Sequence, residues 1–278
     1  MKHAMPAYDE VAEAYSRTLD PDGAGLVDPV LTELAGDVAG QDVLSLACGQ
    51  GQDARLLARL GATVTGIDIS GEMLGHARRI EAADPRGIGY VEGDVQDLAP
   101  FADAIFDGVV CHMALMDVPD LASTIRSVAR VLREPGWFVF SIVHPCYHPH
   151  VEIVSEYLLD HRYRKVVPVD WLPPHAYHRP LGAYVEGLTQ AGLGLERVVE
   201  VHTPGRPSDV GGVPGLLYAR AGRNAPLRTP SARELAERPV PRNTGGPSDR
   251  SLSRSQHLSH RPRTIRGLVG PLPPLARS

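Results

Sequence analysis

The stretch VLSLACGQG, Val43 to Gly51, decides the fold because it runs from a β-rich segment through a glycine turn into a helix-like segment. Glycine has no Cβ, so the backbone of such a turn can approach a ligand closely. The N–H groups at the start of the following helix can face a carboxylate or a phosphate. This stretch therefore predicts a ligand-binding turn at the end of the first strand of an α/β sheet.

Outward from this turn, short β-rich segments alternate with helix-like segments. The expected strands are 42–47, 63–68, 88–93, 106–112, 136–143, 193–202 and 213–221. The expected helices are 52–61, 70–83, 118–133 and 179–192. Such alternation predicts βαβ crossovers and a doubly wound, mostly parallel α/β sheet of the Rossmann-like kind. The last two of the seven expected strands have no helix between them, so the last strand should be antiparallel.

Charge and proline content divide the 278 residues into a body and a tail. Eleven arginines and three acidic residues follow residue 221, which leaves 17 basic and 30 acidic residues before it. An acidic body repels phosphate backbones, so we expect no nucleic acid partner. We expect an N-terminal helical cap over residues 1–40, a ligand-binding core over 41–221 and a disordered Pro/Arg-rich tail over 222–278.

The compartment is predicted from the apolar runs and the cysteines. No run approaches the roughly 20 apolar residues that span a bilayer, and residues 1–10 carry no apolar signal region. Cys48, Cys111 and Cys146 lack CxxC spacing and are expected to be free thiols, with a catalytic thiol at Cys146 left open. We expect a cytoplasmic monomer or homodimer with no membrane contact.

The segment 144–178, rich in histidine, tyrosine and proline, interrupts the strand and helix pattern. It is far longer than the roughly 2–6 residues of an ordinary connection, so we interpret it as a lid over the site. Four of its side chains are predicted to shape an apolar or aromatic substrate site: Tyr147, Trp171, Tyr177 and His178. No HExxH pairing is present in its histidines, and no metal site is expected.

Two carboxylates follow later strands at the edge that carries the glycine turn. Asp68 ends the second strand, 19 residues after Gly49, where it can accept hydrogen bonds from ribose hydroxyls. The turn itself, Gly49 to Ala54, also satisfies the G-x-G-x-x-G/A pattern of dinucleotide folds, so an NAD-dependent oxidoreductase stays open. Asp94 follows the third strand, where its carboxylate can meet an adenine amino group and the amide of Val95 a ring nitrogen.

With this third acidic element, the sequence resembles the class I S-adenosylmethionine (SAM)-dependent methyltransferases, in particular the small type 11 enzymes. The resemblance spans about residues 7–220. Its motif residues are Leu44, Leu46, Gly49, Gly51, Asp68, Ile69, Gly93, Asp94, Phe106, Asp107, Val109, Leu115 and Asp120. It implies SAM as cofactor, with the glycine turn on the methionine moiety, Asp68 on the ribose and Ile69 on the adenine.

The same resemblance assigns further cofactor contacts and shows one departure. The segment YDEVAEAY resembles the family's N-terminal helix, which implies that Tyr8 and Tyr15 close over the cofactor. The cofactor set is completed by Ala47, Cys48, Met73 and His112. Ser45 stands where the family usually has an acid, and its loss is expected to weaken the hold on the cofactor's ammonium group.

Histidines are the expected bases if the methyl acceptor is a hydroxyl or an ammonium group. A histidine has an ordinary pKa of about 6.5, and general base catalysis contributes roughly 10²–10⁴-fold. His144, at the end of the fifth strand, is the first candidate, and His112, at the end of the fourth, is the second. Neither position excludes a structural role, such as capping a strand or lining the cofactor pocket.

Three functions thus remain after the sequence alone. The first is methyl transfer from SAM to an oxygen or nitrogen of a small metabolite, with secondary metabolism as one setting for such a reaction. The second is the NAD-dependent oxidoreductase. The third is a methyltransferase-like protein that binds SAM and catalyses a non-methylating reaction or only binds a ligand.

Overall fold

The strands and helices alternate along the chain as the sequence predicts. The computed structural model describes residues 7–19, 28–146, 161–164, 175–201 and 215–223. The helices are α1 (Ala12–Leu19), α2 (Pro29–Ala35), α3 (Gln52–Arg59), α4 (Gly71–Ala83), α5 (Leu121–Val131) and α6 (Leu181–Gln190), with a 3-10 turn η1 (Leu115–Asp117). The strands are β1 (Asp42–Leu46), β2 (Thr63–Asp68), β3 (Gly89–Glu92), β4 (Phe106–His112), β5 (Leu132–Val143), β6 (His161–Arg164), β7 (His175–His178), β8 (Gly194–Val201) and β9 (Leu216–Arg223).

Seven of these strands form one sheet in the order β3-β2-β1-β4-β5-β9-β8. The five strands from β3 to β5 run parallel to one another, whereas β9 runs antiparallel to both β5 and β8. The strand order reverses between β1 and β4, and ligands of such sheets bind beyond the carboxyl ends at this switch point. The predicted doubly wound sheet with an antiparallel last strand is therefore confirmed.

Apolar side chains alternate between the two faces of the sheet, because successive strand residues point to opposite sides. The face under α5 and α6 is packed by Leu44, Leu46, Val109, Phe138, Phe140, Ile142 and Leu217. The face under α2 and α3 is packed by Val43, Val64, Val110, Trp137, Val139, Leu216 and Tyr218. Both faces of the central strands are thus buried, so a ligand site is expected at their carboxyl edge.

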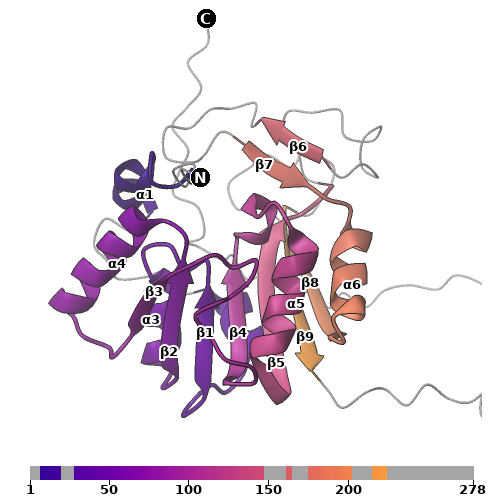
Figure 1. Ribbon diagram of the computed structural model, residues 1–278, viewed down its shortest axis with the longest axis horizontal. Coiled ribbons are helices and arrows are strands. Elements are labelled where there is room, and N and C mark those ends of the chain that lie inside the picture. The colour runs from indigo at the N-terminus through magenta and orange to yellow at the C-terminus, as the bar shows by residue number, and fades with distance from the viewer. Residues whose placement is uncertain (1–6, 20–27, 147–160, 165–174, 202–214, 224–278) are drawn as a thin grey trace, which may run out of the picture.

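Two segments lie over this carboxyl edge. Figure 1 shows α1 above the β2–β3 side and the two-stranded β6–β7 sheet above the β5 side. The strand β7 belongs to the segment 144–178, and it contacts η1, which follows β4. The segment interpreted as an irregular lid therefore contains a short antiparallel strand pair, which the sequence analysis missed.

The main differences from the expected boundaries have local causes. The helix expected over 118–133 begins at Leu121 because the carboxylate of Asp120 accepts the amide of Ser123 at 2.9 Å and caps it. The last strand continues to Arg223, two residues beyond the boundary set at 221, because Gly222 still pairs with Trp137. The tail from 224 to 278 lies outside the described residues.

No helix among the described residues is long and apolar enough to cross a membrane. Cys48, Cys111 and Cys146 are all free of disulfides in this structure.

Candidate active site

The glycine turn joins β1 to α3 through three residues with positive φ. These are Ala47 at 51°, Gly49 at 52° and Gly51 at 88°. The amide of Gly51 donates to the carbonyl of Cys48 at 2.8 Å, which closes the turn. Glycine adopts such conformations without steric cost, so Gly49 and Gly51 suit this turn, whereas Ala47 adopts its positive φ despite its Cβ.

Neighbouring side chains also leave little room for a Cβ at the two glycines of this turn. A Cβ on Gly51 would lie 2.3 Å from the hydroxyl oxygen of Tyr90, and one on Gly49 would lie 3.1 Å from Cε of Met73. Met73 and Cys48 are 2% and 8% exposed. Both side chains therefore support the turn from inside the core rather than standing open beside it.

Asp68 ties the end of β2 to this turn. Its Oδ2 accepts the amide of Gly49 at 2.7 Å and its Oδ1 accepts the amide of Ser70 at 2.9 Å. Burial raises the pKa of Asp68 above its usual value, and these two hydrogen bonds oppose the rise. Each carboxylate oxygen can accept a second hydrogen bond, so Asp68 retains capacity for two ligand hydroxyls.

Next to Asp68, Ile69 exposes half of its surface, the largest fraction among the exposed large apolar side chains of the described residues. An exposed isoleucine beside the Asp68 carboxylate offers an apolar face to a planar ring. The predicted placement of Ile69 against an adenine is compatible with this position.

Asp94 and Val95 follow β3 at the same edge. Asp94 accepts hydrogen bonds from the amide of Gln96 at 2.8 Å and from its side-chain nitrogen at 2.9 and 3.1 Å. Val95 is 7% exposed. The Gln96 side chain also accepts the amide of Asp120 at 2.9 Å and so joins this loop to the start of α5, a contact that the sequence did not indicate.

A hydrogen bond from the Tyr8 hydroxyl joins the N-terminal segment to η1 at the carboxyl edge. Tyr8 donates to Oδ2 of Asp117 at 2.8 Å, and its ring meets that of Tyr15 edge to face at 5.9 Å. Burial, and then the charge of Asp117, raise the pKa of Tyr8 well above its usual value. Burial followed by the charges of Asp53, Asp117 and Asp68 raises that of Tyr15. Both phenols are therefore neutral, and the charges of three carboxylates act on Tyr15.

His112, at the end of β4, lies between two carboxylates. Its Nδ1 is 3.0 Å from Oδ1 of Asp53, and its Nε2 is 3.4 Å from Oδ2 of Asp28. Asp28 also caps α2 and accepts the hydroxyl of Tyr218 at 2.8 Å. Burial lowers the pKa of His112. The charge and hydrogen bond of Asp53 and the charge of Asp28 together raise this pKa by more than burial lowers it, so the net shift is upward.

His144, just beyond β5, has a different pair of partners. Its Nδ1 accepts the amide of Cys146 at 3.1 Å, so Nε2 carries the proton and donates to Oε1 of Glu200 at 2.8 Å. The His144 residue is 5% exposed, while the Glu200 side chain is half exposed. Burial raises the pKa of the Cys146 thiol, which disfavours the reactive thiolate there.

The four substrate contacts predicted in the segment 144–178 divide into two pairs. Tyr147 and Trp171 lie outside the described residues. Tyr177 and His178 lie in β7, where His178 is 5% exposed and the guanidinium carbon of Arg179 sits 4.9 Å from the centre of the Tyr177 ring.

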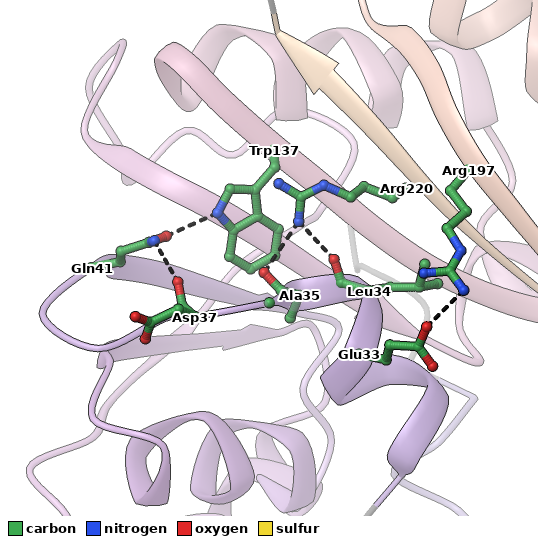
Figure 2. A pocket seen from close by; sticks show the side chains of 9 residues that line it. Glu33, Leu34, Ala35, Asp37, Gln41, Trp137, Arg197 and Arg220 are labelled. Atoms are coloured by element: carbon green, nitrogen blue, oxygen red, sulfur yellow. Dashed lines mark hydrogen bonds and ion pairs between the residues drawn. The ribbon is translucent and has the colours of Figure 1, made fainter.

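A hollow of about 310 Å³ lies at the opposite, amino edge of the parallel strands. Figure 2 shows that its polar side chains face one another: Arg197 is paired with Glu33, and Gln41 accepts the indole N–H of Trp137. Arg220 lies over the Trp137 ring. These groups satisfy one another, and the hollow is remote from the glycine turn, so the carboxyl edge remains the candidate site.

Comparison with known proteins assigns the class. The model of the Methyltransferase domain family matches residues 44–140. A ubiquinone biosynthesis O-methyltransferase from Nitrosospira multiformis is 30% identical over 181 residues, which cover 62% of this chain and 74% of that protein. Proteins of the same name from Albidiferax ferrireducens and Paracidovorax citrulli are 38% and 42% identical, but the chain spans only about half of their lengths, 55% and 44%.

Solved structures agree with the sequence matches. A SAM-dependent methyltransferase from Mesorhizobium loti is 30% identical with a TM-score of 0.60, and the alignment covers 70% of this chain and 96% of that one. A geranyl diphosphate C-methyltransferase from Streptomyces coelicolor has a TM-score of 0.57 at 14% identity over 79% of this chain and 99% of that one, which shows the shared fold. The chain belongs to the SAM-dependent methyltransferases of the Methyltransferase domain family.

SAM is the cofactor of this family, and the described site fits it. The sulfonium and ammonium groups of SAM are cationic, and the negative charges of Asp53, Asp117 and Asp68 all act on the Tyr15 phenol. The side chain of Gln50, inside the glycine turn, is buried with both polar atoms lacking a hydrogen-bond partner, as expected where a ligand completes the bonding. This membership also resolves the choice of cofactor that the glycine spacing left open.

Proposed function

We propose that this protein transfers the methyl group of SAM to an oxygen or nitrogen of a small metabolite. The observation that carries the proposal is the arrangement at one sheet edge: the hydrogen-bonded Gly49 and Asp68 lie on one side, and the His144–Glu200 pair lies on the other. The relatives named as O-methyltransferases favour oxygen as the atom that is methylated.

The cofactor-binding half orients the reacting methyl group. SAM supplies an electrophilic methyl group when it is bound. Asp68 would accept the ribose hydroxyls, Ile69 would pack on the adenine, and Asp53 with Asp117 would provide the negative charge that Ser45 lacks. Holding two reactants near attack distance can contribute up to about 7–11 kcal/mol, so orientation alone explains much of the expected rate.

The acceptor-binding half would remove a proton. Glu200 orients the His144 ring through Nε2–H, which leaves Nδ1 as the basic nitrogen. An acceptor hydroxyl would replace the Cys146 amide at Nδ1 and give up its proton there. His112 is less suited to this role, because both of its nitrogens face carboxylates that favour the protonated ring.

The partners of this reaction follow from the same features. The acidic body disfavours nucleic acid as an acceptor, and the predicted aromatic contacts Tyr147, Trp171 and Tyr177 favour an apolar or aromatic metabolite. We propose that the protein acts as a monomer or homodimer.

Two measurements test the proposal. Thermal unfolding is followed with SAM, S-adenosylhomocysteine and NAD, since a ligand at 100 times its Kd stabilises the native state by about 2.7 kcal/mol. Transfer of labelled methyl groups is then assayed with small phenols, alcohols and amines. We expect stabilisation by the first two ligands and labelled product. Stabilisation by NAD alone would overturn the cofactor assignment, and SAM binding with no product across the panel would favour the non-methylating alternative.

A further inference from the structure

The short turn η1 is held from two sides by residues that are far apart in the sequence. Arg179, which follows β7, binds its backbone from the side of the segment 144–178. Tyr8, from the N-terminal segment, binds its Asp117 side chain. Figure 1 shows α1 and β7 above the same edge of the sheet, and β7 contacts η1. The turn therefore connects β7 with the N-terminal segment that carries Tyr8.

The Arg179 side chain is held in this contact by three hydrogen bonds to backbone carbonyls. Its guanidinium donates to the carbonyls of Leu115 at 3.2 Å, Val118 at 2.7 Å and Pro119 at 2.8 Å. The residue is only 3% exposed, and the Tyr177 ring lies along its guanidinium. A buried guanidinium is costly unless it is hydrogen-bonded, so this geometry is strongly specified.

The turn can transmit a displacement because it is itself compact. The amide of Asp117 donates to the carbonyl of Ala114 at 2.8 Å, and the Leu115 side chain is fully buried in the core. A carbonyl that loses the Arg179 donor must find another partner, which shifts the turn. The Tyr8–Asp117 distance is 2.8 Å, and a shift of about 1 Å would take it beyond hydrogen-bond length.

We infer that Arg179 is a positioning residue that couples the acceptor-side segment to the cofactor-side cap through η1. Its guanidinium fixes η1, η1 presents Asp117, and Asp117 holds Tyr8 closed over the cofactor crevice. The inference rests on the proposed role of Tyr8 in covering the cofactor. By linkage, a methyl acceptor that binds and stabilises β7 strengthens the binding of the cofactor. The cofactor then strengthens the binding of the methyl acceptor by the same factor.

The test is the affinity for S-adenosylhomocysteine, measured by calorimetry on the full chain with Arg179→Met. We expect about a tenfold weaker Kd, which corresponds to about 1.4 kcal/mol. The matched control is Arg220→Met, because Arg220 also donates to two backbone carbonyls, those of Leu34 and Ala35, and also lies over an aromatic ring, but at the opposite edge (Figure 2). We expect less than a twofold change for the control.

A double-mutant comparison separates coupling from general loosening. In a Tyr8→Phe background the Asp117 contact is already gone, so Arg179→Met should add less than a twofold change. Equal losses in Arg179→Met and Arg220→Met, or a full tenfold loss in the Tyr8→Phe background, would overturn the inference. Should Arg179→Met not fold, Arg179→Lys keeps the charge without the planar fork, and its loss should lie between wild type and tenfold. If the wild type itself fails to bind S-adenosylhomocysteine, the proposed function fails instead.

Discussion

The two halves of the sheet's carboxyl edge differ in how far along the chain their contacts reach. In the cofactor half, Asp68 binds the amide of Gly49, which is 19 residues away. In the acceptor half, His144 pairs with Glu200, which is 56 residues away, and Arg179 binds η1 across more than 60 residues. The contact at the centre of the cofactor half is therefore specified by one βαβ unit, whereas the acceptor half exists only once the whole sheet has assembled.

This difference in sequence separation indicates which part of such a site can vary in sequence between relatives. The contact between the glycine turn and the Asp68 carboxylate depends little on distant side chains. The acceptor half depends on side chains from β5, β7 and β8, so changes in any of these strands alter it while the contact between Gly49 and Asp68 stays intact. Substrate differences within the family are expected to reside there.

The largest effect should come from breaking the cofactor half at Asp68. Asp68→Ala removes the proposed ribose acceptor and the partner of the Gly49 amide. Hydrogen bonds to charged groups are worth about 1.5–3 kcal/mol each, so the loss of two predicts roughly 10²–10⁴-fold weaker binding of S-adenosylhomocysteine. Calorimetry measures this loss, and Asp42→Asn, a carboxylate at the amino end of β1 paired with Arg133, serves as control. Affinity retained in Asp68→Ala contradicts the assignment.

The next effect concerns the acceptor half alone. His144→Ala should lower kcat by about 10²-fold, at the lower end of the range for general base catalysis, while the Kd for S-adenosylhomocysteine changes less than twofold. Glu200→Gln keeps an acceptor for Nε2–H and should cost less. Initial-rate kinetics with the acceptor found in the methylation panel measures both variants. A kcat equal to that of the wild type removes His144 from the base role.

Most of the fold was predictable because its signals are local. β2 and β4 have the predicted bounds, and Ser70 caps α4 as a serine before a helix should, by accepting the amide of Met73 at 3.1 Å. The pair β6–β7 was missed because 161–164 and 175–178 are short and separated by residues without an alternating pattern.

The site was predictable to the extent that backbone geometry determines it. The sequence spacing predicted that the turn of Gly49 and Gly51 meets Asp68, and the hydrogen bond between Gly49 and Asp68 agrees; their contacts with the cofactor stay a prediction. The roles of Asp117 and Arg179 were not predicted, because neither lies in a motif and each acts across more than 60 residues. Their one available signal was indirect: a charged residue beside an otherwise apolar run requires a partner when it is buried.

A smaller effect should appear at the junction of the two halves, where His112 joins Asp28 to Asp53. Because its pKa is raised in the folded protein, protonated His112 contributes stability that is fully present below the unfolded value of about 6.5. That contribution is lost as the pH rises through the folded-state pKa. Urea unfolding of wild type and His112→Gln should therefore differ more at pH 6 than at pH 9. A difference that is constant with pH shows that His112 is not a cation there.

The smallest effect should come from the tail, and two truncations that start two residues apart sharpen its boundary. Deleting 224–278 should change neither the thermal midpoint nor the affinity for S-adenosylhomocysteine, since β9 ends at Arg223. Deleting 222–278 also removes the pairing of Gly222 with Trp137 and the hydrogen bonds of the Arg223 guanidinium to the carbonyls of Ala129 and Leu132. That deletion should lower the midpoint by a few degrees, as about 1 kcal/mol does in a domain of this size. Since the loss falls at the amino edge of β5, cofactor affinity should survive both cuts; a tail that contributes to the cofactor half would instead weaken binding in the shorter deletion.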